Sequence, residues 1–399
     1  MMKIGMLTSG GDCQALNAAM RGVVKGLTTN VDELEIYGFE NGYKGLIYEQ
    51  YRILTASDFS GILTRGGTIL GSSRQPFKQM RVPDENGLDK VEAMKSTYRK
   101  LGLDCLVILG GNGTQKTANL LREEGLNIIH LPKTIDNDIA VTDHTPGYGS
   151  SARYLAETVA EIGADVKSLP IHVCIVEAMG RNAGWITAAS ALAREKKGDA
   201  PHLIYLPERP FREEEFLEDV KRLYEELGGV VVVASEGLKK ENGEPIVPPI
   251  FRSGRSVYYG DVGAYLAELV IRKLGIKARS EKPGICGRAS IPLQSAVDRE
   301  EAVLAGRTAL ESALAGQTGV MVSFVREASE DGSYRMHPGT VPIEEVMMYE
   351  RKVPESYINE RGNDVTEEFV SWCKPLADVH HREFIDFQEY YWERKGKRE

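Results

Sequence analysis

The sequence has 399 residues, of which 42% are hydrophobic and 27% charged, a composition typical of a soluble globular protein with two or three domains. The formal net charge of −9 argues against a surface that binds nucleic acid or an anionic membrane. Local basic pockets for phosphate groups remain compatible with this charge.

No apolar run is long enough to cross a membrane, and the first residues begin a strand without the features of a signal peptide. The cysteines lie far apart and form no CxxC pair, which favours buried, reduced thiols at Cys13, Cys105, Cys174, Cys286 and Cys373. We therefore expect a cytoplasmic protein without nucleic-acid or membrane partners.

The chain opens with a strand, a glycine turn and a helix. Residues 3–8 form a short apolar strand that ends in Ser9-Gly10-Gly11-Asp12, and apolar residues recur at helical spacing from Leu16 to about Leu27. This is the first half of a βαβ unit. Paired glycines let backbone N–H groups approach a phosphate, and the helix N-terminus adds favourable partial charge, although most such turns serve only backbone geometry.

The same pattern recurs further along. A strand at 35–39 and a glycine-rich loop with two arginines at 63–74 precede a helix at 91–101. A continuous apolar strand at 104–109 then leads into residues 110–114, Gly-Gly-Asn-Gly-Thr, and a helix from Gln115 to about Glu124. Because the carboxyl ends of parallel strands share one edge of a sheet, both glycine loops are predicted at that edge, where they indicate a phosphate site.

An acidic loop follows the next strand. The apolar run 127–130 is predicted to be a buried parallel strand, and directly after it come residues 132–138, Pro-Lys-Thr-Ile-Asp-Asn-Asp, at the ligand crevice of an open α/β sheet. In an extended loop Asp136 and Asp138 point to opposite sides, so one can face a substrate hydroxyl while the other orients a metal or a neighbouring side chain. The alternative is a solvated Asx turn.

From residue 147 onward the alternation of helix and strand starts again. Strands at 171–176 and 230–234 end in polar turns at 177–181 and 235–237, which indicates a second α/β domain facing the first. Further strands are predicted at 203–206 and 319–325, and helices at 150–162, 183–193, 212–227, 265–274, 297–314 and 342–349. Residues 237–256 are predicted to be a surface loop, and an aromatic stripe indicates a C-terminal amphipathic helix, at Phe384, Phe387 and Tyr391.

Five motifs occur in one order, at residues 9–12 with Asn17, 66–74, 110–114, 132–138 and 177–181. Together they resemble the 6-phosphofructokinase family over roughly residues 1–325, and residues 340–375 resemble its longer bacterial members, a group that mixes ATP and pyrophosphate users. The resemblance implies an α/β fold of two facing Rossmann-like three-layer domains. It assigns donor binding to residues 1–147 and 288–340, sugar-phosphate binding to 148–287 and 341–375, and a helical extension to 376–399.

The resemblance also implies an activity, the transfer of a phosphoryl group from ATP to the 1-hydroxyl of fructose 6-phosphate in glycolysis. Asp136 is the expected general base, with Thr134, Asp138 and Arg181 as the other catalytic residues. The expected donor site comprises Gly11, Tyr43, Arg74, Gly111, Asn112, Gly113, Thr114 and Lys133. The expected sugar-phosphate site comprises Thr134, Asp136, Met179, Gly180, Arg181, Glu236, Arg279 and Arg288.

The expected cofactor is Mg²⁺, which bridges the donor phosphates, with Asn112 at the metal position. The expected assembly is a homodimer or homotetramer with sites shared between subunits, because the resemblance implies that Arg279 reaches the sugar phosphate of a neighbouring subunit. Arg74 is expected to act as a cation on the donor phosphates, and Gly11 as a backbone donor to the transferring group.

Two positions bear on the donor. In the family, pyrophosphate enzymes carry an acidic residue at the position of Gly113, where ATP enzymes carry glycine because a side chain would intrude on the α-phosphate of the nucleotide. Lys133 is typical of pyrophosphate enzymes at its own position. Because steric exclusion is harder to evade than a flexible lysine, ATP is the expected donor and pyrophosphate the alternative.

Other positions depart from the family pattern. Asn112 replaces a metal-orienting aspartate, and an amide is a weaker Mg²⁺ partner than a carboxylate. His172 replaces an arginine expected between subunits, and Ile285 replaces a His or Tyr at the sugar. These changes suit either the same substrate or another phosphosugar such as sedoheptulose 7-phosphate. A third interpretation is a non-catalytic protein that senses a phosphosugar or nucleotide, against which the retained Asp136 and Arg181 argue.

Overall fold

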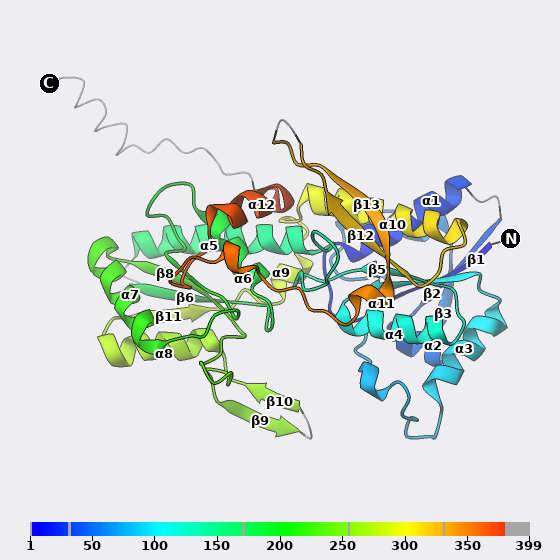
Figure 1. Cartoon of the computed structure of the whole chain (residues 1–399), viewed down its shortest axis with the longest axis horizontal. Helices are drawn as coiled ribbons and strands as arrows, with labels where there is room; N and C mark the ends of the chain where they lie inside the picture. The colour runs from blue at the N-terminus through cyan, green and yellow to red at the C-terminus, as the bar shows by residue number, and fades with distance from the viewer. Residues whose placement is uncertain (1, 31–32, 170–171, 254–255, 330–331, 380–399) are drawn as a thin grey trace.

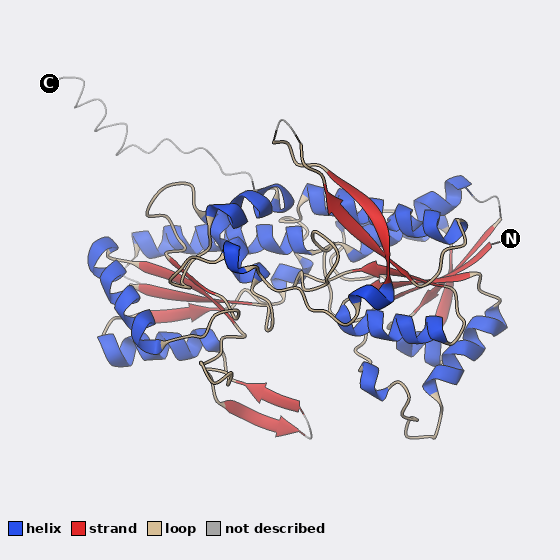
Figure 2. Ribbon diagram, in the orientation of Figure 1, coloured by secondary structure: helices blue, strands red, loops and turns tan. Residues whose placement is uncertain are grey.

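The computed structural model describes residues 2–30, 33–169, 172–253, 256–329 and 332–379. The chain folds into two α/β bodies that lie side by side, each built around its own sheet (Figures 1 and 2). This arrangement confirms the predicted α/β fold with two facing domains. Among the residues described, no helix has the length and apolar character needed to span a membrane.

The first sheet is built from seven strands: β1 Met2–Thr8, β2 Leu34–Phe39, β3 Tyr51–Leu54, β4 Cys105–Gly110, β5 Ile128–Pro132, β12 Val320–Arg326 and β13 Met336–Pro342. Their order is β13-β12-β5-β4-β1-β2-β3. The strands from β12 to β2 are parallel, and the edge strands β3 and β13 pair antiparallel with their neighbours. Every residue of β4 is buried, as expected of a parallel strand covered on both faces.

Helices cover both faces of this sheet: α1 Leu16–Asn30, α2 Tyr43–Ile47, α3 Lys90–Leu101, α4 Asn112–Glu123, α10 Ala296–Leu314 and α11 Ile343–Val346. α1 and α10 pack on one face, and α2, α3, α4 and α11 pack on the other. Glycines let α1 and α10 approach closely, because a Cβ on Gly22 would overlap the Val303 carbonyl and one on Gly306 the Ala19 carbonyl. Larger residues at these two positions would force the helices apart.

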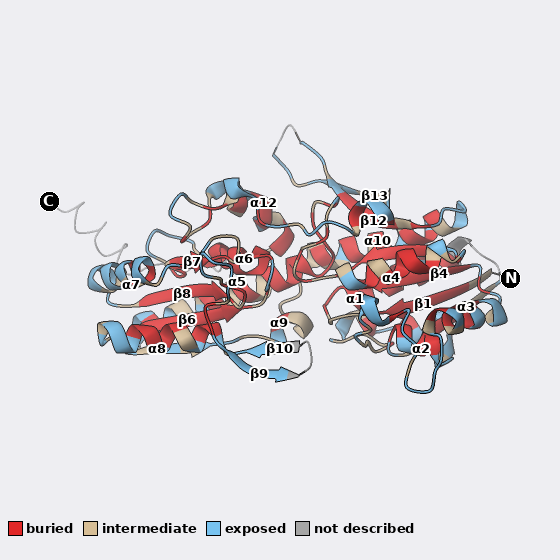
Figure 3. Cartoon of the chain, turned by 60° about the horizontal axis from the view of Figure 1, so that its bottom comes forward, coloured by how far each residue is buried: buried red, intermediate tan, exposed pale blue. Residues whose placement is uncertain are grey.

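The second sheet consists of the parallel strands β6 Val173–Ala178, β7 Leu203–Tyr205, β8 Val230–Ser235 and β11 Ala278–Glu281, in the order β11-β6-β8-β7. The helices around it are α5 Tyr148–Ser168, α6 Trp185–Ala189, α7 Glu213–Leu227, α8 Val262–Leu274, α9 Cys286–Ala289 and α12 Glu367–Ala377. Short 3-10 helices are η1 Ala56–Phe59, η2 Ile62–Thr64, η3 Phe77–Gln79, η4 Ser190–Ala193 and η5 Glu355–Tyr357. Buried residues line both sheets (Figure 3).

A β-hairpin projects from the second body, with strands β9 Pro249–Ser253 and β10 Ser256–Tyr259 (Figures 1 and 3). Its side chains Phe251 and Tyr258 are exposed, and their tilted rings lie 6.1 Å apart between centroids. The prediction of a loop over 237–256 is therefore wrong for β9. β11 and β13 were not predicted either; β11 has only four residues and β13 carries prolines and a glycine.

The cysteines are free, and four are buried as predicted: Cys13, Cys105, Cys174 and Cys373. The prediction is wrong for Cys286, which is exposed at the first position of the short helix α9. The predicted C-terminal amphipathic helix around Phe384, Phe387 and Tyr391 lies outside the described residues.

Candidate active site

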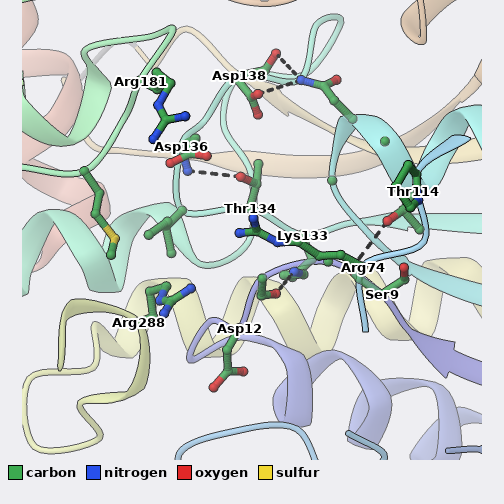
Figure 4. A pocket seen from close by; sticks show the side chains of 18 of the residues that line it. Ser9, Asp12, Arg74, Thr114, Lys133, Thr134, Asp136, Asp138, Arg181 and Arg288 are labelled. Carbon is green, nitrogen blue, oxygen red and sulfur yellow. Dashed lines mark hydrogen bonds between the residues drawn. The ribbon is translucent and has the colours of Figure 1, made fainter. Parts of the chain in front are cut away.

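A cavity of about 640 Å³ opens where the carboxyl ends of strands from both sheets meet. Its walls follow β1, β4 and β5 of the first sheet and β6 and β8 of the second. This volume is ordinary for a small-molecule site. The predicted site residues that line it are Gly11, Arg74, Gly111, Asn112, Gly113, Thr114, Lys133, Thr134, Asp136, Asp138, Met179, Arg181, Glu236 and Arg288 (Figure 4).

The acidic loop after β5 is held in a defined conformation rather than in a solvated turn. The Thr134 hydroxyl accepts the Asp136 N–H at 3.1 Å, and the Thr145 hydroxyl donates to the Thr134 carbonyl at 2.8 Å. Asn137 is buried with a φ of 52°, a conformation that asparagine tolerates, and its Oδ1 accepts the Thr145 N–H at 3.0 Å. This bend carries Asp136 and Asp138 into the cavity (Figure 4).

Burial raises the pKa of both aspartates. For Asp136, the nearby Glu236 adds to this effect, while Lys133 and Arg288 oppose it. For Asp138, burial and the charge of Asp136 raise the pKa to about 7, against the hydrogen bond from Asn112. Asp138 Oδ2 accepts the Asn112 amide at 2.6 Å, whereas its Oδ1 is buried and has no hydrogen-bond partner among the residues described. Bound cations would lower the cost of keeping two carboxylates ionised here.

Lys133 lines the cavity and is almost fully buried. Its ammonium donates to the Gly11 carbonyl. Burial lowers the pKa of Lys133, while Cys13, Asp12 and Asp136 oppose this shift. Asp12 also lines the cavity, although no role was predicted for it. Burial raises its pKa, and its Oδ1 accepts the Cys13 N–H at 2.9 Å. Three aspartates and several positively charged side chains therefore line the cavity.

The two glycine loops lie together on the first sheet, as their positions after β1 and β4 predict. Gly10 has a φ of 92°, and its carbonyl accepts a hydrogen bond from the Ser72 hydroxyl at 2.6 Å. This bond connects the glycine loop after β1 to the loop at 63–74, which carries the arginines. Asn17 holds that loop from α1, with its amide 2.7 Å from the Gly67 carbonyl. The start of α4 faces the cavity, and a Cβ built on Gly113 would meet none of the described atoms within 4 Å. Backbone N–H groups at such a helix start suit an anion.

The second body contributes the turns after β6 and β8. The Gly180 N–H approaches Glu236 Oε1 at 3.4 Å, and the Ser235 hydroxyl donates to the Gly180 carbonyl at 2.8 Å. Gly180 has a φ of 115°, which bends the chain between Met179 and Arg181. Gly180 itself does not line the cavity, but it fixes two residues that do.

Besides Gly180, two further predicted site residues are not part of the cavity wall. Tyr43 is buried, and its hydroxyl donates to the Thr114 carbonyl at 2.8 Å, so it supports the start of α4 instead of facing the cavity. Arg279, on β11, lines a separate cavity of about 370 Å³ with Tyr154 and Cys174. Its contact with a sugar phosphate in a neighbouring subunit stays a prediction. His172 and Ile285 are also absent from the residues that line the candidate active-site cavity.

The residues present suit one divalent cation held partly by substrate. No group of three His, Cys, Asp or Glu residues able to hold a metal occurs within the described part of the chain. Mg²⁺, however, is commonly bound by one or two carboxylates together with water and substrate phosphates. Asp138 Oδ1, which is buried and has no hydrogen-bond partner within the described residues, provides such a ligand. Asn112, predicted at the metal position, directs its oxygen to Gln115 at 3.0 Å, so this oxygen is already engaged.

The sequence profile of the family described as Phosphofructokinase matches residues 3–313. A pyrophosphate–fructose 6-phosphate 1-phosphotransferase of Rhodospirillum rubrum is 33% identical, over 94% of each chain. An ATP-dependent 6-phosphofructokinase of Spirochaeta thermophila is 39% identical, over 80% of this chain and 86% of the relative.

A solved structure shows the same architecture over nearly the whole chain. The pyrophosphate-dependent phosphofructokinase of Marinobacter aquaeolei superposes with a TM-score of 0.82 at 31% identity, covering 97% of this chain and 94% of that one. These relatives include enzymes named for ATP and enzymes named for pyrophosphate. With the cavity described above and this agreement along the chain, the protein belongs to the phosphofructokinase family.

Proposed function

We propose that the protein transfers a phosphoryl group from ATP to the 1-hydroxyl of fructose 6-phosphate, giving fructose 1,6-bisphosphate and ADP. The observation that carries the proposal is the position of Asp136, a largely buried carboxylate in a cavity that glycine loops and arginines share. Glycine loops and a helix start suit donor phosphates, and arginines suit a sugar phosphate. The cavity therefore offers a base between two phosphate-binding regions.

Asp136 accepts the proton of the sugar 1-hydroxyl while that oxygen attacks the γ-phosphorus of the donor. The new oxygen–phosphorus bond forms as the bond to the β,γ-bridging oxygen breaks, and ADP leaves with the electron pair. Burial and the charge of Glu236 raise the pKa of Asp136, which makes it a stronger base than a solvated aspartate. Thr134 fixes the loop that carries this base, through its bond to the Asp136 N–H.

Charge neutralisation supports the same step. Arg74 and Lys133 are assigned to the donor, and Arg181 and Arg288 to the sugar phosphate, together with Met179, Gly180 and Glu236. Asp138 is the residue that would hold Mg²⁺, which when bound would supply positive charge to neutralise the donor phosphates. We assign donor binding to residues 1–147 and 288–340, and sugar-phosphate binding to 148–287 and 341–375.

Gly113 supports ATP as the donor. The open space around its Cα means that a side chain at this position would project into the cavity at the start of α4. An acidic side chain there would occupy volume that the α-phosphate of a nucleotide needs and would repel it. Glycine leaves that volume free.

Initial rates with fructose 6-phosphate and Mg²⁺, measured side by side with ATP and pyrophosphate, test the proposal. We expect turnover with ATP, and a loss of at least about tenfold in ATP efficiency for Gly113→Asp, equivalent to about 1.4 kcal/mol of transition-state stabilisation. Gly113→Ala separates bulk from charge and should lie between the two. Turnover with pyrophosphate alone would refute ATP as the donor. Absence of turnover with either donor, with sugar-phosphate binding retained, would instead indicate a sensing protein.

Pyrophosphate is the second candidate donor, favoured by Lys133 and by two of the relatives above. If pyrophosphate is the donor, Lys133→Gly should abolish that activity, because the lysine charge would act directly on a small, highly charged anion. If ATP is the donor, the same variant should keep measurable activity with a raised KM for ATP, because Lys133 would then hold only one part of a longer donor. Comparing catalytic efficiency with fructose 6-phosphate and sedoheptulose 7-phosphate then tests the acceptor.

We also propose a homodimer or homotetramer with sites completed between subunits, because Arg279 lies outside the candidate active-site cavity of its own chain. Mixing inactive Asp136→Asn with inactive Arg279→Ala protein should restore activity, since some sites in mixed oligomers would then have both residues intact. Light scattering gives the oligomeric state independently. A monomer, or mixtures that stay inactive, would contradict shared sites.

A further inference from the structure

A chain of hydrogen bonds connects three side chains at one wall of the cavity. Gln115, fully buried on the first turn of α4, donates its amide to Asn112 Oδ1 at 3.0 Å. Asn112 in turn donates its amide to Asp138 Oδ2 at 2.6 Å and approaches the Asp138 carbonyl at 3.3 Å (Figure 4). Gln115 is not among the residues that line the cavity, and its hydrogen-bonded link to Asp138 within the described residues runs through Asn112.

The chemistry of the carboxylate fixes the direction of both bonds. An ionised carboxylate only accepts hydrogen bonds, so in the ionised form that a cation ligand needs, Asp138 Oδ2 faces the NH₂ of Asn112 at 2.6 Å. The Asn112 oxygen then faces Gln115, which must present its own NH₂. Rotating Asn112 by half a turn would place two oxygens in contact and would remove the bond to Gln115.

This arrangement leaves different atoms available on the two residues. The Asn112 oxygen is occupied by Gln115, whereas Asp138 Oδ1 is buried and has no partner in the described parts of the chain. Toward Asp138, Asn112 thus acts as a hydrogen-bond donor. The oxygen without a partner among the described residues is Oδ1 of Asp138. Tyr43 fixes the same helical turn through its bond to the Thr114 carbonyl, which limits movement of the chain at Asn112.

We propose that Gln115 is a positioning residue: it holds Asn112 as the donor that orients Asp138, so that Asp138 supplies the oxygen ligand for the divalent cation and Asn112 does not. The inference rests on the proposed function, because it concerns the cation used with the phosphoryl donor. Groups that orient a metal ligand in this way typically change metal affinity by about 10- to 100-fold when removed.

The test measures Mn²⁺ binding by electron paramagnetic resonance of the free ion, with β,γ-methylene-ATP or methylenediphosphonate present so that no turnover is needed. Gln115→Met removes the donor while keeping the length of the side chain, and it should raise the Mn²⁺ dissociation constant about tenfold. Asp138→Asn should raise it more. In the double variant, Gln115→Met should add nothing to Asp138→Asn, since its effect passes through Asp138.

The opposite result would overturn the inference. If Asn112 were the ligand, losing Gln115 would free its oxygen, and Gln115→Met would leave Mn²⁺ binding unchanged or tighten it. Fully additive effects of Gln115→Met and Asp138→Asn would likewise refute a connection through Asp138. If circular dichroism shows that Gln115→Met does not fold, Gln115→Asn, which shortens the amide by one methylene, gives the same comparison.

Gln294→Met is the matched control, because this part-buried glutamine also donates its amide, to the Gln14 carbonyl at 3.0 Å, but lies outside the cavity. Its Mn²⁺ binding should equal that of the wild type. In kinetic assays, Gln115→Met should raise the Mg²⁺ requirement and leave the KM for fructose 6-phosphate within about twofold. Failure of the proposed function would appear as no turnover by the wild type with either donor, whereas failure of this inference would appear as unchanged Mn²⁺ binding.

Discussion

A buried ionic network around His144 joins the end of the acidic loop to both bodies. His144 Nδ1 lies 2.9 Å from Asp143 Oδ2, and Nε2 lies 2.7 Å from Glu301 Oε2 on α10. Asp143 also accepts hydrogen bonds from Arg326 on β12 at 3.1 Å and from Trp372 on α12 at 3.1 Å. We expect His144→Gln to weaken the contact between the two bodies, because the glutamine carries no charge to balance the carboxylates.

The magnitude follows from what remains after the substitution. Breaking a buried ion pair typically costs about 3–5 kcal/mol. Here Asp143 keeps Arg326 and Trp372, and Glu301 keeps the Tyr334 hydroxyl at 2.6 Å. We therefore expect a loss of about 3 kcal/mol in the free energy of unfolding at pH 6, at the lower end of that range.

The stability that His144 contributes should depend on pH. Burial lowers the pKa of His144, but the hydrogen bonds with Asp143 and Glu301 outweigh it and raise the pKa above the usual 6.5. A group with a raised folded pKa contributes fully below its unfolded pKa, and the contribution is lost as pH rises through the folded value. The pKa of Asp143 is held low by His144 and Arg326 despite burial, so its charge does not change in this range.

Urea unfolding of the wild type and His144→Gln, followed by tryptophan fluorescence at pH 6 and pH 9, measures the effect. The difference between the two proteins should shrink as pH rises above about 6.5, by at most about 1.4 kcal/mol per pH unit. An equal difference at both pH values would show that folded His144 is not protonated and would refute the reasoning. His337→Gln is the control, because His337 and Glu327 form an exposed pair at 2.8 Å worth at most about 1 kcal/mol.

Three further predictions concern single residues. Asp136→Asn should lower kcat by about 10²- to 10⁴-fold in steady-state assays while calorimetry still detects fructose 6-phosphate binding, because only the general base is lost. Gly237→Ala should lower thermal stability and activity together, since its Cβ would overlap the Arg181 carbonyl; activity at the wild-type level would contradict this. In native protein, Ellman's reagent should modify the exposed Cys286 first and spare Cys13, whose burial raises the thiol pKa to about 12.

The sequence was most informative where local pattern and topology coincide. The continuous apolar run at 104–109 is too short for a typical helix, so its length favoured a buried strand. Once the strands were parallel, the loops after β1, β4 and β5 had to meet at one edge. For this reason most predicted site residues line one cavity, including Gly11, Asp136 and Arg181.

The sequence was less informative where only distant contacts decide the outcome. Tyr43 is buried because its hydroxyl donates to the carbonyl of Thr114, 71 residues further along the chain. No local sequence pattern reveals such a contact. Asp12 gave no signal beyond its place in a turn, and its position in the cavity depends on the second body. The hairpin β9–β10 was missed because Lys239, Lys240 and Gly243 beside it mark a loop, while its own strands are short.

The mixed signature at Gly113 and Lys133 has a physical explanation in the placement of the two residues. The Lys133 ammonium lies against the Gly11 carbonyl, beside the backbone that we assign to the transferring phosphoryl group. That part of the donor is common to ATP and pyrophosphate, so a cation there attracts both. Gly113 stands in open space at the start of α4, where only the longer donor would extend. We therefore infer that residue 113 selects between donors, whereas residue 133 sets how strongly their shared phosphates are held.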